Sequence, residues 1–171
     1  MECRLDQPLP EVNPRLPVRI GLLEAQDLAA FARFRPELDR VVIQRRWEAG
    51  EQCFAVWHEE AIVHAGWATT GEARVEFLDC ELALEPGDVF QFDSHTAPAF
   101  RGRDLAGARV AWMARFFRAA GARRLLAVVW PGNPTAFRPL EKAGYRRAGW
   151  IRVLRLGSFR RVIQRPSRSR Q

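Results

Sequence analysis

The sequence predicts an α/β protein of one domain, in which helices cover the faces of a mixed β-sheet. Its length of 171 residues allows one sizeable core and is short for two. A meander of predicted strands in the first half gives way to alternating strands and helices in the second. With 47% hydrophobic and 27% charged residues, the composition excludes a mainly disordered or collagen-like protein.

Three regions are predicted along the chain. Residues 1–17 hold four prolines and few periodic apolar positions, so we expect an irregular arm there. Residues 18–157 form the predicted domain, without an internal repeat or a linker. Residues 158–171 are polar and basic, which favours a flexible tail.

The first half of the domain is predicted to combine two helices with a run of strands. Residues 18–22 have the pattern of a strand. Helical spacing of apolar residues predicts a helix over residues 22–34, ended by Pro36, and a second over residues 37–47, ended by Gly50. The strand candidates that follow are residues 52–57, 61–68, 74–84 and 89–96.

The second half is predicted as two helices alternating with strands. Residues 105–120 form a long amphipathic helix, and residues 124–130 are nearly all apolar, as in a buried strand. Asn133 as N-cap and Pro134 at the first helical position begin the last helix. Residues 145–156 supply one or two final strands.

The net charge of +7 comes almost entirely from arginine side chains, because Lys142 is the single lysine among the 27 basic residues. Five of the surplus charges fall in the predicted tail, at Arg160, Arg161, Arg165, Arg168 and Arg170. A nucleic-acid partner is therefore not expected, apart from a weak contact of RNA with these arginines. A simply solvated tail is the plainer interpretation.

The sequence favours a cytoplasmic protein without a membrane span. No stretch approaches the roughly 20 apolar residues that a transmembrane helix needs, and the N-terminus lacks the pattern of a secretory signal. Cys3, Cys53 and Cys80 are odd in number and far apart, so neither a disulfide framework nor a zinc site is indicated.

A short loop rich in glycine and arginine separates the predicted strand 89–96 from the long helix. The first amides of a helix have no internal partner, and the helix dipole adds positive potential there. Small residues let a ligand approach the backbone, and Arg101 and Arg103 add charge. These features predict a turn that binds a pyrophosphate.

Two segments resemble the signatures of the GCN5-related N-acetyltransferases (the GNAT family). Residues 97–106, APAFRGRDLA, resemble the acetyl-CoA signature Arg/Gln-x-x-Gly-x-Gly/Ala. Residues 133–145, NPTAFRPLEKAGY, resemble the second signature, an Asn followed by a helix that ends in Glu-Lys-x-Gly-Phe/Tyr. The resemblance covers residues 18–156, although the first half matches only in element order. It implies a GNAT-like sheet that splays at its centre, between the strands at 89–96 and 124–130.

The resemblance implies an acetyl-CoA-dependent N-acetyltransferase, in which a primary amine attacks the thioester directly. Acetyl-CoA is then the acyl donor, and no metal is involved. The backbone of the strand before the loop would pair with the pantetheine arm, and the loop amides would hold the pyrophosphate. The residues implied to bind the donor are Ser94, His95, Thr96, Arg101, Gly102, Arg103, Asp104, Leu105, Ala106, Gly107 and Asn133.

The reaction also needs a base that collects the proton of the amine. Strict alternation along residues 89–96 puts Gln91, Asp93 and His95 on one face, with the last two near the end that should splay. His95 has the better intrinsic pKa, whereas Asp93 would need a pKa raised by burial. We predict these two as catalytic candidates, with a structural His–Asp pair as the alternative.

Two residues depart from the family pattern. Asp104 stands where the signature has its first glycine; it could cap the helix or pair with Arg101 or Arg103, or it could weaken donor binding. Leu140 replaces a tyrosine that protonates the leaving thiolate in many members. The alternative function is therefore a non-catalytic acyl-CoA-binding or regulatory GNAT-like module.

The acceptor is predicted only as a small-molecule or peptide amine, and a homodimer is also open. Acidic residues on the strand before the splayed one would suit a cationic amine, or they are ordinary exposed charges; they are Glu76, Asp79 and Glu81. Trp130 is a candidate substrate contact.

Among interior residues, we expect His64 to be a core residue with its hydrogen bonds satisfied. We expect Arg109 to snorkel or to pair with an acid.

Overall fold

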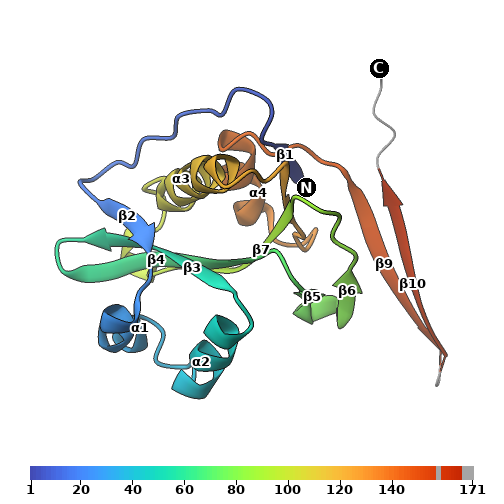
Figure 1. Ribbon diagram of the computed structural model, residues 1–171, viewed down its shortest axis with the longest axis horizontal. Helices are drawn as coiled ribbons and strands as arrows, with labels where there is room; N and C mark the ends of the chain where they lie inside the picture. The colour runs from blue at the N-terminus through green and yellow to red at the C-terminus, as the bar shows by residue number, and fades with distance from the viewer. Residues whose placement is uncertain (157–158, 167–171) are drawn as a thin grey trace.

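The computed structural model describes residues 1–156 and 159–166. Its centre is a six-stranded sheet in the order β1-β8-β7-β4-β3-β2 (Figure 1). Only β7 and β8 pair in parallel, and all other neighbours are antiparallel. Helices α3 and α4 cover one face, and α1 and α2 cover the other (Figure 1). The predicted mixed α/β fold is confirmed.

The bounds of the elements are as follows. The sheet contains β1 (Glu2–Arg4), β2 (Arg19–Leu22), β3 (Gln52–His58), β4 (Ala61–Thr69), β7 (Asp88–Thr96) and β8 (Arg124–Ala127). The helices are α1 (Leu28–Phe34), α2 (Arg40–Glu48), α3 (Leu105–Ala119) and α4 (Pro134–Lys142). Separate hairpins pair β5 (Ala73–Val75) with β6 (Cys80–Leu82) and β9 (Gly149–Leu156) with β10 (Phe159–Pro166). Short 3-10 turns are Ala25–Asp27, Glu76–Leu78 and Pro98–Phe100.

The expected irregular arm is wrong for the first residues of the chain. Residues 2–4 form β1, which pairs with β8 and closes that edge of the sheet. Cys3 and Leu5 are both buried and belong to the core under α3, which explains why this segment is ordered against the sheet.

Two strand predictions also need correction. The expected strand 74–84 is instead the β5–β6 hairpin, because the 3-10 turn Glu76–Leu78 and a left-handed Asp79 at φ 49° reverse the chain. The expected strand 124–130 ends at Ala127.

The C-terminal prediction is wrong in part. Residues 159–166, placed in a flexible tail, form β10 and pair with β9 along its whole length. This hairpin lies beside the central sheet and does not join it (Figure 1). Residues 157–158 and 167–171, with Arg168 and Arg170, lie outside the described residues.

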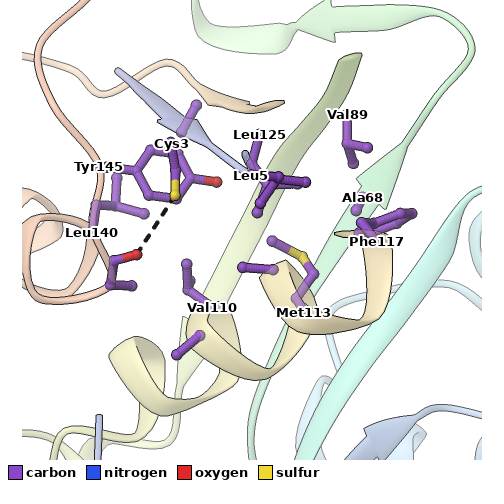
Figure 2. Close-up of a cluster of buried hydrophobic side chains, with 14 of the residues drawn as sticks. Cys3, Leu5, Ala68, Val89, Val110, Met113, Phe117, Leu125, Leu140 and Tyr145 are labelled. Atoms are coloured by element: carbon purple, nitrogen blue, oxygen red, sulfur yellow. Dashed lines mark hydrogen bonds between the residues drawn. The ribbon is translucent and has the colours of Figure 1, made fainter. Parts of the chain in front are cut away.

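The core under α3 fixes the position of that helix. Val110, Met113 and Phe117 of α3 pack with Leu5 and with Leu125 of β8 (Figure 2). Burial of these side chains is worth about 1.5–3 kcal/mol each. It holds the first turn of α3 at the end of β7.

Two further observations concern targeting and cysteines. Within residues 1–156 and 159–166, no helix combines the length and hydropathy that a bilayer crossing requires. The three cysteines are buried thiols and form no disulfide among these residues.

Candidate active site

The candidate site is a slot between β7 and β8, where the two parallel strands part. They pair from Asp88↔Arg124 to Gln91↔Ala127; β8 then ends, whereas β7 continues to Thr96. The slot has a volume of about 970 Å³ and reaches the first turn of α3. We call the end at the last strand pair its closed end.

A β-bulge shapes the β7 wall of the slot. Two residues of β7, Asp93 and Ser94, stand opposite the single residue Gly66 of β4. Asp93 adopts a left-handed φ of 46°. The extra residue of a bulge interrupts the alternation of side chains along a strand.

The predicted common face is therefore wrong for Gln91, whereas Asp93 and His95 both contact the α1–α2 side of the sheet. Gln91 accepts a hydrogen bond from Arg109 of α3, on one face of the sheet. His95 instead packs edge-on against Phe34 of α1, with ring centroids 5.4 Å apart, on the other face. The bulge, which lies between Gln91 and His95, accounts for their side chains facing opposite sides of the sheet.

Asp93 is held between two arginines of the α1–α2 region. Its carboxylate accepts hydrogen bonds from Arg35 Nη1 at 3.1 Å and from Arg46 Nη1 at 2.6 Å. Burial alone would raise the pKa of Asp93, but the hydrogen bond from Arg46 and the charge of Arg35 outweigh it and lower the pKa. A carboxylate so stabilised is a poor base, which disfavours the predicted catalytic role of Asp93.

His95 lies in the slot wall with its ring available. Burial, followed by the charge of Arg35, lowers the pKa of His95 from its usual value. The imidazole is thus neutral near pH 7 and able to accept a proton. The predicted structural pair of His95 with Asp93 does not occur, because Asp93 is bonded to the two arginines.

The turn before α3 presents unpaired backbone donors. Among the described residues, the amides of residues 102–107 donate to no protein acceptor, and the first helical bond is Ala108 N to Asp104 O. Gly102 has a φ of 75°, and Asp104 a φ of 59°, so both have left-handed backbone at this turn. Arg101 and Arg103 are exposed beside it. This arrangement suits an anion.

Asp104 does not make the contacts predicted for it. Its side chain does not cap α3, and it pairs with neither Arg101 nor Arg103. It instead accepts from Lys142 of α4 and, at 3.1 Å, from Nε of Arg15 in the N-terminal arm. The hydrogen bond from Lys142, aided by the charge of Arg15, lowers the pKa of Asp104. The carboxylate is therefore ionised but neutralised by two cations.

Most of the residues implied to bind the donor line the slot. They are Ser94, His95, Thr96, Arg101, Gly102, Arg103, Asp104, Leu105, Ala106 and Asn133. Gly107 is outside the lining and has a packing role: a Cβ there would lie 3.1 Å from Val12 Cγ1 and 3.4 Å from the Pro139 carbonyl. Asn133 makes no side-chain cap; its Oδ1 accepts from Thr135 Oγ1 at 2.7 Å.

The position of the missing tyrosine is filled by an apolar side chain. Leu140 is buried and lines the slot. Tyr145 is in the core beside Cys3 and Leu140 (Figure 2), and burial raises the pKa of its phenol well above the usual value. The phenol therefore does not take over the role of the missing acid.

The acidic residues expected near the acceptor do not line the slot. Glu76 is exposed, Asp79 pairs with Arg74, and Glu81 lies on β6. These residues were predicted on a strand over residues 74–84, which is instead the β5–β6 hairpin, so they do not border the slot as expected. The slot wall on this side is aromatic: Phe77 and Trp130 meet edge-on with ring centroids 6.1 Å apart.

Sequence reasoning missed the interior contacts of the slot. Arg109 neither snorkels nor pairs with an acid among the described residues; it is buried and bonded to His64 and Gln91. His64 is a buried core residue as expected, and its Nδ1 lies 2.8 Å from Thr96 Oγ1.

Comparison with known proteins supports the fold. No family model and no curated protein matches the sequence. The structure is similar to aminoglycoside N-acetyltransferase AAC(6')-Iy in complex with the bisubstrate analogue CoA-S-monomethyl-acetylneamine, with TM-score 0.64 and 16% identity over 82% of this chain and 98% of that one.

Two further solved structures agree. An acetyltransferase from Trypanosoma brucei has TM-score 0.58 and 18% identity over 82% of this chain and 99% of that one. The ribosomal-protein-S18-alanine N-acetyltransferase from Escherichia coli has TM-score 0.61 and 15% identity over 80% of this chain and 81% of that one. These likenesses, all at 18% identity or below, define the class of fold. It is the fold of the GCN5-related N-acetyltransferases, as the two signatures indicated.

Proposed function

We propose that the protein is an acetyl-CoA-dependent N-acetyltransferase. The observation that carries this proposal is the row of unpaired amides at residues 102–107, at the mouth of a slot between parted strands. Such a row, backed by a helix dipole and two arginines, suits the pyrophosphate of coenzyme A. The acetyl thioester then extends along β7 towards the closed end.

The chemistry requires few side chains. The nitrogen lone pair of the amine attacks the thioester carbonyl carbon and forms a C–N bond. The C–S bond then breaks, and its electron pair leaves with the sulfur as a thiolate. A backbone N–H fixed on the bulged strand stabilises the oxyanion. His95 receives the proton released by the amine, and the thiolate regains a proton from solvent. Positioning in the slot supplies much of the acceleration.

The acceptor is a primary amine of a small molecule or a peptide. Phe77 and Trp130 on the slot wall favour an acceptor with an apolar body beside its amine.

We also propose that the protein acts in the cytoplasm. Its three cysteines are buried free thiols, which suits a reducing compartment.

The test of this function is a titration followed by a turnover assay. Coenzyme A and acetyl-CoA are titrated by calorimetry, and release of free thiol is then measured with a panel of primary amines. Micromolar binding and amine-dependent thiol release are expected. Absence of any coenzyme A binding would refute the proposal.

The alternative is a non-catalytic acyl-CoA-binding module, which Leu140 favours because it leaves the leaving thiolate without a nearby acid. Coenzyme A thiolate is a tolerable leaving group, so this absence slows the reaction without forbidding it. Tight binding without turnover on every amine class would establish the alternative.

His95→Ala is expected to lower kcat/KM by about 100-fold and to remove an acid limb from the pH profile. The base acts in its neutral form, and the pKa of His95 is lowered. Activity of the wild type should therefore be level above pH 6.5 and fall only at more acid pH. His58→Ala, which changes a histidine outside the slot, should keep this limb. A His95→Ala enzyme with the wild-type profile would remove the base from the proposal.

Asp104→Asn is expected to tighten coenzyme A binding by about tenfold at low salt. The substitution removes a negative charge beside the proposed pyrophosphate site and releases Arg15 and Lys142. Asparagine also tolerates the left-handed backbone at this position. The gain should shrink at high salt, because exposed charges are screened. Weaker binding in calorimetry would mean that the carboxylate is needed to organise the turn.

A further inference from the structure

The closed end of the slot contains a buried cation without an anion. Arg109, on α3, is 1% exposed and yet lines the slot together with Gln91. Burial lowers the pKa of Arg109 to about 10, so the guanidinium is still charged at neutral pH. Its side-chain partners within residues 1–156 and 159–166 are His64, Met113 and Gln91, and no Asp or Glu of these residues forms an ion pair with it.

Within the described residues, each hydrogen bond of the Arg109 side chain goes to a neutral acceptor. Its Nε donates to His64 Nε2 at 3.0 Å, its Nη1 to Met113 Sδ at 3.4 Å, and its Nη2 to Gln91 Oε1 at 2.8 Å. A guanidinium has five N–H groups, so these contacts leave donors unused. Neutral acceptors also compensate a buried charge less well than a carboxylate does.

His64 does not supply the missing charge. Burial and the charge of Arg109 keep the pKa of His64 well below its usual value, so its ring is neutral. Because Nε2 accepts from Arg109, the ring hydrogen is on Nδ1 and is donated to Thr96 Oγ1 at 2.8 Å. The hydroxyl hydrogen of Thr96 is then available to a ligand in the slot.

Gln91 adds a second donor without an acceptor. Its Oε1 accepts from Arg109, and its Nε2 is buried with no hydrogen-bond partner in the part of the chain that the structure describes. A buried donor that has lost its bonds to water and gained no other acceptor is destabilising. A cation and an amide donor therefore meet at one place, where the strands β7 and β8 close together.

The neighbouring backbone is shaped for this guanidinium. A Cβ at Gly66 of β4 would lie 2.9 Å from Arg109 Cζ, so only glycine leaves room for it. The bulge of β7 lies opposite the same residue. The Arg109 guanidinium thus lies against Gly66 of β4, at the place where β7 bulges.

We propose that Arg109 and Gln91 form a subsite for the carboxylate of an acyl chain, so that the slot accepts coenzyme A thioesters of short dicarboxylic acids such as succinyl-CoA. This inference rests on the proposed function, because it needs a thioester anchored at the turn before α3. A donor held there directs its acyl end to the closed end of the slot. A carboxylate at that point satisfies the Gln91 amide and neutralises Arg109 together.

The transfer step is the one described above with a longer acyl group. The amine forms a C–N bond to the thioester carbonyl carbon, the C–S bond breaks, and the thiolate takes up a proton equivalent to the one the amine loses. The distal carboxylate keeps its charge throughout. The product is an amide that ends in a carboxylate.

The experiment compares donors that differ at the distal group. Coenzyme A, acetyl-CoA, butyryl-CoA and succinyl-CoA are titrated into the full chain by calorimetry; butyryl-CoA is the neutral control with the same number of carbons. Succinyl-CoA is expected to bind about tenfold more tightly than butyryl-CoA. Equal affinities for these two donors would overturn the inference.

Two variants separate a subsite from a structural arginine. Gln91→Glu puts a carboxylate next to Arg109, which should raise the melting temperature and abolish the preference for succinyl-CoA over butyryl-CoA. Arg109→Met keeps the volume and should abolish the same preference. A Gln91→Glu protein that keeps the preference would refute the subsite.

The outcomes also distinguish this inference from the proposed function. If coenzyme A itself fails to bind, both fail. If coenzyme A binds but the succinyl preference is absent, only the carboxylate subsite is lost. If the carbonyl oxygen of the thioester were the natural occupant, Gln91→Glu would weaken acetyl-, butyryl- and succinyl-CoA alike.

Discussion

Ala106→Glu is expected to weaken coenzyme A binding by at least about 100-fold while the protein stays folded. Ala106 is the second residue of α3, is partly exposed and lines the slot. A carboxylate in the first turn of a helix stabilises that helix by about 0.3–1 kcal/mol. The same charge would stand where the pyrophosphate of the donor is proposed to bind. Calorimetric titration and thermal unfolding measure the two effects separately.

The matched control is Ala106→Gln, which adds the same bulk without the charge. It should weaken binding much less than Ala106→Glu, because its amide can donate to a phosphate oxygen. If both variants bound coenzyme A like the wild type, the phosphates would not reach this turn. The proposed function would then lose its main support even though the fold would stand.

The parts of the fold that could be predicted depend on local sequence. The boundaries of α3 and α4 follow from apolar spacing, from Pro134 and from the glycines after each helix. The turn at residues 101–104 could be found because its chemistry is carried by adjacent residues. The start of α2 was predicted at residue 37 and lies at Arg40, because the side chain of Asp39 accepts from Val41 N at 2.8 Å and caps the helix there.

The parts that could not be predicted depend on contacts between distant residues. Asp104 bonds to Arg15, 89 positions away, and to Lys142, 38 positions away, whereas the sequence suggested its neighbours. The pairing of β1 with β8 likewise brings Cys3 opposite Leu125, which lies far along the chain. No local pattern specifies such partners.

The bulge on β7 had the largest effect on the site prediction. Strict alternation grouped Gln91 with Asp93 and His95, but the extra residue opposite Gly66 leaves Gln91 on the α3 side and turns Asp93 and His95 to the α1–α2 side. The only signal in the sequence was an aspartate within the predicted strand, since aspartate tolerates the left-handed φ that Asp93 adopts better than most residues do. The role of Arg109 was missed because a buried arginine without an acid is rare.

Asp93→Asn is expected to destabilise the protein by about 3 kcal/mol at pH 7. Arg35 and Arg46, whose side chains are each 11% exposed, both bond to the Asp93 carboxylate, and a neutral amide would leave two like charges close together. Asparagine accepts the left-handed φ, so backbone strain does not contribute. Denaturant unfolding measures the loss. Asp6→Asn, which breaks an exposed pair with Arg4, should change stability little.

The pH dependence gives an independent check on the same ion pair. Because the pKa of Asp93 is lowered on folding, its contribution to stability is present above the unfolded value of about 3.9 and is lost as pH falls through the folded pKa. The difference in stability between the wild type and Asp93→Asn should therefore shrink below about pH 4. A difference that stays constant to pH 2 would mean that the arginines are not held by a carboxylate charge. Turnover by the folded variant should persist, because the carboxylate anchors the α1–α2 region to β7 and His95 takes the proton.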